Sequence, residues 1–118
     1  MHGFLRYRVD FRARLSQNAG MDRNAVIETL QRHRQELQKA GIAHLRLFGS
    51  VARNESGGGS DVDLAADFDR SARRTLLTMA RLENRLSELL GVKVDLAAAE
   101  MLREPVRARL LREGIHAF

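Results

Sequence analysis

Two aspartates that alternate with large apolar residues constrain the fold of this chain more than any other feature. They lie in the stretch Ser60-Asp61-Val62-Asp63-Leu64. Such alternation is typical of a half-buried β-strand, in which residues i and i+2 share a face. Asp61 and Asp63 are therefore predicted to point the same way, about 7 Å apart along the strand, while Val62 and Leu64 point into the core. Because two neighbouring carboxylates repel each other, a divalent-metal site is the most economical explanation.

A glycine-serine pair ends the apolar run that precedes this stretch. Ten residues separate Gly49-Ser50 from the first aspartate, Asp61. Gly49 allows the backbone to approach a phosphate closely, and the N–H groups after it open a short helix, whose N-terminus is a natural anion site. The Ser50 hydroxyl adds a donor. Arg53 follows one turn later, and we expect it either to reach the same phosphate or to pair with Glu55 or Asp61.

Length and composition limit the class of protein. A chain of 118 residues is expected to form one domain with a genuine core. It contains no cysteine, which excludes a disulfide framework, a thiol nucleophile and a cysteine-based zinc site. No apolar run approaches the roughly 18 residues that are needed to span a bilayer. We therefore predict a cytoplasmic protein without a membrane segment.

The positive charge is concentrated at one end of the chain. The net charge is +5, and residues 1–20 supply +3 of it through four arginines and one aspartate. We interpret residues 1–20 as a disordered basic extension, with Met21 as the natural start and residues 21–118 as the domain. Direct nucleic-acid binding through the basic residues is the less favoured alternative, because an acidic strip around Asp61 and Asp63 favours cations over bare phosphates. Asp67 and Asp69 are interpreted as ordinary surface charge.

The rest of the chain alternates between helical and strand patterns. Helices are expected from Asp22 or Asn24 to about Ala40, from Ser71 to about Leu90 and over residues 104–113, with a short turn or helix after Gly49. Strands are expected over residues 42–48, 61–68, 92–96 and 115–118. The glycine-rich stretch 54–60 is placed inside the domain, between two strands that pair like a hairpin. These elements predict an α/β or α+β domain with a small mixed sheet of three or four strands flanked by helices.

A third aspartate lies between apolar residues in Val92-Lys93-Val94-Asp95-Leu96. If its strand adjoins that of Asp63, Asp95 completes a carboxylate triad. Asp61, Asp63 and Asp95 would then hold two Mg²⁺ ions about 3.5–4 Å apart, which clamp the attacking and leaving oxygens of an in-line displacement. Asp95 would help to deprotonate an incoming hydroxyl. The simpler alternative is that these are solvated carboxylates at strand ends.

Three stretches together resemble the DNA polymerase β nucleotidyltransferase superfamily, and more closely its minimal nucleotidyltransferase branch. They are Leu-Phe-Gly-Ser-Val-Ala-Arg at 47–53, Ser-Asp-Val-Asp-Leu at 60–64 and Leu-Gly-Val-Lys-Val-Asp-Leu at 90–96. The resemblance covers about residues 22–118. It implies Mg²⁺-dependent transfer of a nucleoside monophosphate from an NTP, with pyrophosphate as the leaving group. It also implies that Asp61, Asp63 and Asp95 hold the metal and that Gly49 and Ser50 bind the triphosphate.

The same resemblance implies a protein partner. Minimal members are commonly the antitoxin of a toxin–antitoxin pair with a HEPN-domain ribonuclease, and they neutralise it by AMP transfer from ATP to a toxin tyrosine. A domain this small has little surface left to recognise an acceptor, so a partner is expected to supply it. Two alternatives remain, namely a non-catalytic module that masks its partner and a nucleotidyltransferase that acts on a small molecule such as an aminoglycoside.

Overall fold

The computed structural model describes residues 22–53, 61–72 and 75–118. Its helices are α2 (Arg23–Arg32), α3 (Arg34–Lys39), α4 (Gly49–Ala52), α5 (Leu76–Leu90), the 3₁₀ helix η1 (Ala99–Met101) and α6 (Val106–Glu113). Its strands are β1 (Ile42–Phe48), β2 (Val62–Phe68), β3 (Val94–Ala98) and β4 (Ile115–His116). The predictions about residues 1–20 and the stretch 54–60 lie outside the described residues.

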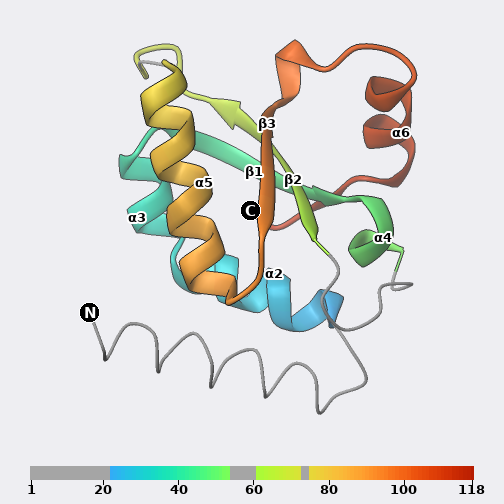
Figure 1. The fold of residues 1–118 in the computed structure, drawn as a ribbon, viewed down its shortest axis with the longest axis horizontal. Coiled ribbons are helices and arrows are strands. Elements are labelled where there is room, and N and C mark those ends of the chain that lie inside the picture. Colours follow the sequence, from blue (N-terminus) through green and yellow to red (C-terminus); the bar gives the residue numbers. More distant parts are fainter. Residues whose placement is uncertain (1–21, 54–60, 73–74) are drawn as a thin grey trace.

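The four strands form one mixed sheet in the order β3-β2-β1-β4. β1 is antiparallel to both β2 and β4, whereas β2 and β3 are parallel. Helices α3 and α5 lie on one side of the sheet and α6 lies on the other (Figure 1). The predicted fold class is therefore confirmed, as are the hairpin-like pairing of the first two strands and the terminal edge strand.

The main core lies between the sheet and helices α2, α3 and α5. Its side chains come from every second position of the strands and from one face of each helix, as the alternation at Val62 and Leu64 predicts. Burial of these aliphatic side chains is the principal force that holds the helices to the sheet. The fully buried large members are Val26, Leu30, Leu37, Ile42, Leu45, Leu47, Val51, Val62, Leu64, Leu86, Leu90 and Val94.

A smaller apolar cluster attaches α6 to the opposite face of the sheet. Leu110 of α6 is buried against Ala65 of β2 and Ala99 of η1, with Phe48 and Leu102 packed at the edge of the cluster. This cluster covers the middle of the face and leaves the ends of the strands to polar residues. It therefore determines how α6 lies relative to the aspartates.

Side chains of α5 protect the free edge of β3. The backbone N–H of Val94 donates to Ser87 Oγ at 3.0 Å, and that of Leu96 donates to Glu83 Oε2 at 2.9 Å. An edge strand whose N–H groups are already paired is a poor template for addition of another strand. These bonds also hold β3, and with it Asp95, against α5.

The helices differ from the sequence prediction at their ends. Asp22 caps the first helix as expected, and its Oδ1 accepts from the Asn24 N–H at 2.9 Å. The predicted helix reaches the neighbourhood of Ala40 as expected, but His33 leaves the helical region (φ −104°, ψ 16°) and divides it into α2 and α3. The predicted cap Ser71 instead donates to Asp69 in a turn, and α5 begins at a reciprocal cap between Thr75 and Thr78.

Two further boundaries move toward the C-terminus. The third strand was expected at residues 92–96 but runs from Val94 to Ala98, because its parallel pairing with β2 continues through small alanine side chains. The last helix begins at Val106, with Pro105 before it rather than in its first turn. The first two residues of α5, Leu76 and Leu77, are 91% and 60% exposed.

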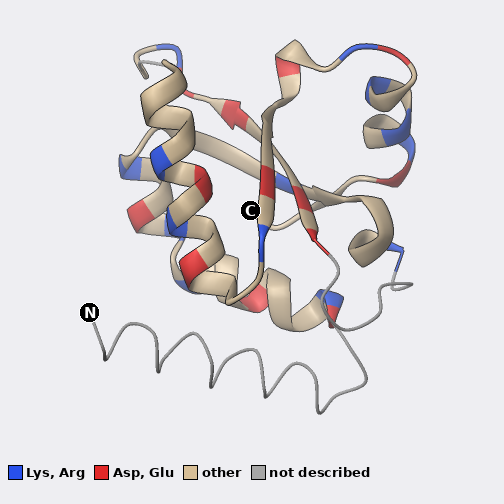
Figure 2. Cartoon of the chain, in the orientation of Figure 1, with Lys and Arg blue, Asp and Glu red and all other residues tan. Residues whose placement is uncertain are grey.

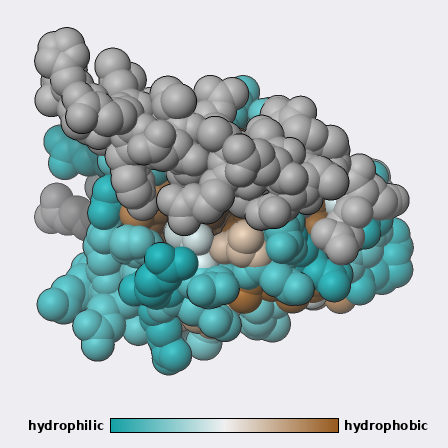
Figure 3. Space-filling model, turned by 90° about the horizontal axis from the view of Figure 1, so that it is seen from below, coloured by the Kyte–Doolittle hydropathy of each residue, from teal (hydrophilic) through white to brown (hydrophobic). Residues whose placement is uncertain are grey.

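One face of the molecule carries mostly hydrophilic side chains where the structure describes it. On the face that Figure 3 shows, apolar side chains outside the grey atoms are confined to a small area. In the part of the chain that the structure describes, each helix is too short or too polar to cross a membrane.

Asp67 is not the ordinary surface charge that the sequence suggested, because it pairs with a mostly buried arginine. Arg46 Nη2 lies 3.3 Å from Asp67 Oδ2, the Arg46 side chain is only 18% exposed, and its Nε has no partner among the residues that the structure describes. Asp67→Ala is expected to lower the free energy of unfolding by about 1–3 kcal/mol, because it leaves this guanidinium without its carboxylate. Urea unfolding measures the change.

The exposed ion pair between Arg32 and Glu28, 3.8 Å apart, provides the matched control. Glu28→Ala should change the free energy of unfolding by less than about 1 kcal/mol. Equal losses in Asp67→Ala and Glu28→Ala would contradict a structural role for Asp67.

Candidate active site

The tertiary structure brings Asp63 and Asp95 to the same level of the sheet. They are register partners on the parallel neighbours β2 and β3, whose backbones lie about 4.8 Å apart. Both side chains project from the face opposite the main core, since Val62 and Leu64 project into that core. Asp61 lies immediately before β2. The adjacency on which the predicted carboxylate triad depends is therefore present.

The Asp63 carboxylate lies in an unfavourable electrostatic environment. Its pKa is raised above the ordinary value, first by burial and then by the negative charges of Asp95 and Asp61, while the positive charge of Arg109 opposes the shift. Figure 2 shows the acidic segments of β2 and β3 close together. The three predicted carboxylates thus act on one another, and their repulsion is only partly compensated.

These carboxylates are not gathered into a closed cage. Among residues 22–53, 61–72 and 75–118, no three acidic or histidine side chains converge closely enough to form a ready metal cluster. Asp63 is half-buried, whereas Asp61 and Asp95 are exposed. The donor set nevertheless suits Mg²⁺, because that ion prefers carboxylate oxygens and the raised pKa of Asp63 shows negative charge that the protein leaves uncompensated.

The Gly-Ser turn lies against the same carboxylate. Phe48, the last residue of β1, pairs with Asp63, and Gly49 and Ser50 then begin α4. Gly49 has a φ of +79°, and a Cβ at this position would contact the Asp63 carboxylate, with its Cγ at 3.3 Å. A side chain is excluded here both by the backbone conformation and by the neighbouring aspartate.

Arg53 contacts a residue that the sequence did not suggest. It follows α4 as its C-cap, and its Nη1 donates to Glu113 Oε1 at 2.8 Å. This hydrogen bond is the main reason that the pKa of Glu113 lies below its ordinary value. The ion pair joins α4, which begins at the Gly-Ser turn, to the C-terminal end of α6.

A second residue that sequence reasoning missed is Arg109. It lies in α6, and its positive charge lowers the pKa of both Asp63 and Glu113. Basic segments recur along α6 in Figure 2. The four-residue spacing of Arg109 and Glu113 shows from sequence alone that they share a helix face. It does not show that this face is turned toward the aspartates, which depends on how Leu110 packs.

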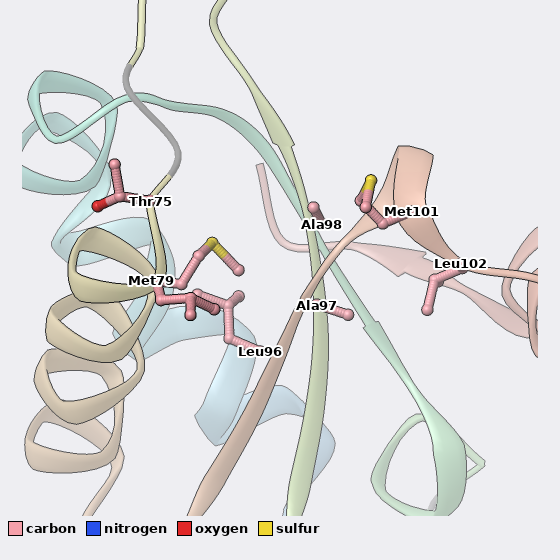
Figure 4. Close-up of a pocket in the computed structure, with 8 residues that line it drawn as sticks. Thr75, Met79, Leu96, Ala97, Ala98, Met101 and Leu102 are labelled. Carbon is pink, nitrogen blue, oxygen red and sulfur yellow. The ribbon is translucent and has the colours of Figure 1, made fainter.

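An apolar cavity of about 570 Å³ lies at the free edge of β3, away from the Gly-Ser turn. Figure 4 shows Thr75 and Met79 on the α5 side of the strand and Met101 and Leu102 on the η1 side. Its lining includes none of the six predicted site residues. The candidate active site is therefore the polar region around Asp63 and not this cavity.

Comparison with known proteins agrees with the geometry. Residues 27–116 match the nucleotidyltransferase domain family. The chain is 36% identical over 91 residues to MJ0126 of Methanocaldococcus jannaschii, which is assigned as a protein adenylyltransferase; the match covers 76% of this chain and 91% of the relative. It is 35% identical over 88 residues to the protein adenylyltransferase MntA of Thermococcus cleftensis, covering 74% of this chain and 87% of MntA.

Solved structures show the same relationship. One assigned as a minimal nucleotidyltransferase aligns with a TM-score of 0.67 at 38% identity, covering 80% of this chain and 95% of the other. Two toxin–antitoxin structures share the fold at 18% identity. One, with AMP-PNP, aligns with a TM-score of 0.62 and covers 83% of this chain and 73% of the other. The other, of MntA–HepT, aligns with a TM-score of 0.53 and covers 81% of this chain and 68% of the other. The chain belongs to the nucleotidyltransferase domain family. It is a nucleotidyltransferase, as the resemblance implied.

Proposed function

We propose that this chain is an antitoxin that transfers AMP from ATP to a partner protein, a HEPN-type toxin, in an Mg²⁺-dependent reaction. The observation that carries the proposal is the register pairing of Asp63 with Asp95 beside the Gly49 turn. This pairing brings two carboxylates together at one end of the sheet, next to a turn whose backbone conformation favours glycine. A metal–nucleotide complex requires these two components together.

Each predicted residue has a role in this reaction. Asp61, Asp63 and Asp95 hold two Mg²⁺ ions, which when bound supply positive charge against the triphosphate. The Gly49 backbone and the Ser50 hydroxyl bind the triphosphate, and Arg53, oriented by Glu113, adds a cationic contact.

The transfer itself is an in-line displacement. The acceptor hydroxyl oxygen bonds to the α-phosphorus while the bond from that phosphorus to the bridging oxygen of the β-phosphate breaks. Pyrophosphate leaves with the electron pair, and the acceptor proton passes to the Asp95 carboxylate. Because phosphoryl-type transfer leaves little covalent chemistry for the protein, positioning and charge compensation supply most of the catalysis.

The choice of nucleotide and partner rests on relatives. The protein adenylyltransferase MntA is a 35% identical relative, and the fold is shared with toxin–antitoxin structures that include MntA–HepT and a complex with AMP-PNP. These similarities favour ATP over other nucleotides and a toxin over a small molecule as the acceptor. Because the reaction consumes ATP, the proposal also places the chain in the cytoplasm.

Transfer of a radioactive label tests the proposal. The protein is incubated with ATP labelled at the α-phosphate, Mg²⁺ and the protein encoded by the neighbouring gene, and label on that protein is measured. We expect the wild type to label it and Asp61→Asn/Asp63→Asn to lose at least about a thousandfold in rate. Asp69→Asn is the matched control, because an asparagine oxygen can still accept from Ser71. Removal of Mg²⁺ with EDTA should stop the labelling.

The two rivals predict different results. If the chain is a masking module, Asp61→Asn/Asp63→Asn neutralises the partner as well as the wild type does, and neither protein transfers label. A nucleotidyltransferase for small molecules labels a compound in an acceptor screen and leaves the neighbouring protein unlabelled. Unlabelled partner protein with the wild-type chain would refute AMP transfer to that protein.

A further inference from the structure

Arg109 of α6 is a cation whose charge acts on the candidate active site. Its side chain is exposed, and within the described residues it makes no hydrogen bond or ion pair. Its charge nevertheless acts on Asp63 of β2 and on Glu113 of α6. Within the described residues, Arg109 therefore acts on the aspartates through its charge and forms no ion pair with them.

The fold holds this arginine in place through its two neighbours on α6. Leu110, the next residue, is 2% exposed and anchored in the small cluster with Ala65 and Ala99. Glu113, one turn further on, is fixed to α4 by its 2.8 Å bond with Arg53. Because residues four apart share a helix face, Arg109 lies on the side of α6 that carries this ion pair.

The short helix α4 connects the Asp63 carboxylate with α6. α4 begins at Gly49, whose Cα hydrogen lies where a Cβ would touch the Asp63 carboxylate. Arg53 ends the same four-residue helix and contacts α6. α4 therefore extends from the Asp63 carboxylate to the face of α6 that carries Glu113 and Arg109.

We propose that Arg109 contacts the β- and γ-phosphates of the bound nucleoside triphosphate and stabilises the charge of the departing pyrophosphate. A guanidinium presents a planar set of donors that suits phosphate oxygens, and its charge is permanent at neutral pH. An exposed arginine near, but not bonded to, a cluster of carboxylates is free to serve a ligand that arrives between them. This inference rests on the proposed nucleotide site and assigns a residue to its leaving-group side.

Nucleotide binding tests this role separately from transfer. Isothermal titration calorimetry of the full chain with Mg²⁺ measures the Kd for ATP and for AMP in the wild type and in Arg109→Ala, Arg109→Lys and Arg112→Ala. We expect Arg109→Ala to weaken ATP binding by about tenfold to a hundredfold, as for loss of a hydrogen bond to a charged group. AMP binding should change less than about twofold, because AMP lacks both outer phosphates. Arg109→Lys keeps the positive charge but lacks the planar set of guanidinium donors. We expect its Kd for ATP to lie between those of the wild type and Arg109→Ala.

Arg112 is the matched control. It is exposed on the same helix and its charge also lowers the pKa of Glu113, but it is not among the charges that shift the pKa of Asp63. Arg112→Ala should therefore bind ATP like the wild type. Wild-type ATP affinity in Arg109→Ala would overturn the inference, as would equal losses for ATP and AMP, an equal loss in Arg112→Ala, or no ATP binding by the wild type.

The outcome does not depend on which acceptor is correct. If the wild type binds ATP but labels no protein, AMP transfer to a partner fails while the comparison of Arg109 with Arg112 stands. If AMP transfer succeeds and Arg109→Ala has an unchanged KM for ATP, only the role of Arg109 fails.

Discussion

Replacing Asp63 with asparagine is expected to abolish AMP transfer and to raise the melting temperature of the chain. Transfer should fall at least about a hundredfold, because the proposed Mg²⁺ site loses one of its charged oxygens. The melting temperature should rise by a few degrees, because burial and then the negative charges of Asp95 and Asp61 disfavour the ionised Asp63 carboxylate. A residue that costs stability and supports activity is typical of a functional site.

The pH dependence of this stability gain follows from the pKa of Asp63. Since that pKa is raised in the folded chain, the folded state binds a proton more readily than the unfolded chain does. The carboxylate therefore destabilises the fold at neutral pH, and this cost disappears as the pH falls below about 4. Melting curves of the wild type and Asp63→Asn should differ at neutral pH and converge in acid.

Two measurements separate this explanation from a general effect of removing negative charge. Asp69→Asn should change neither the melting temperature nor the transfer rate appreciably. Mg²⁺ with ATP should raise the melting temperature of the wild type more than that of Asp63→Asn, because only a state that binds the ligand is stabilised by it. An Asp63→Asn variant that melts earlier than the wild type at neutral pH, or that transfers AMP at the wild-type rate, would contradict this account of Asp63.

Replacing Gly49 with alanine is expected to cost both stability and activity. The φ of +79° places position 49 in the left-handed region, which costs a residue with a Cβ about 1–2 kcal/mol. The new methyl group would also meet the Asp63 carboxylate and push it from its position. We expect the free energy of unfolding to fall by at least about 1 kcal/mol and AMP transfer to fall at least about a hundredfold, measured by urea unfolding and by label transfer.

Gly41 offers a control with the same two penalties at the other end of the strand pair. Its φ is +111°, and a Cβ there would lie 2.7 Å from the Cβ of Ala72. It precedes Ile42, which pairs with Phe68, whereas Gly49 follows Phe48, which pairs with Asp63. Gly41→Ala should lose stability and, where it remains folded, keep its transfer rate. Loss of transfer in both variants to the same extent would mean that Gly49 acts only through stability.

The sequence determined the features that depend on local periodicity and local backbone preference. Alternation placed Val62 and Leu64 in the core, and both are fully buried. Capping residues predicted the start of α2, where Asp22 is the cap, and the helix ends predicted near Ala40 and Leu90 match those of α3 and α5. Three motifs indicated the family. These patterns are readable because side-chain direction repeats every two residues in a strand and every 3.6 in a helix.

Element boundaries were less predictable where two nearby residues serve equally well. Ser71 and Thr75 are both good caps, and a reciprocal hydrogen bond with Thr78 favours the second. The third strand follows its pairing with β2 through Ala97 and Ala98 rather than its own run of valines. In both cases the deciding contact comes from a partner that local propensity does not contain.

The arrangement of the candidate site was decided by the tertiary structure. Sequence singled out Asp63 and Asp95 separately, but only the sheet order makes them register neighbours. From the sequence alone, Arg109 and Glu113 are indistinguishable from ordinary surface charges. The packing of Leu110 and the bond from Arg53 to Glu113 position their helix beside the candidate site. The physical reason is that periodicity specifies which way a side chain points from its own element, whereas burial of apolar surface between distant segments specifies which elements become neighbours.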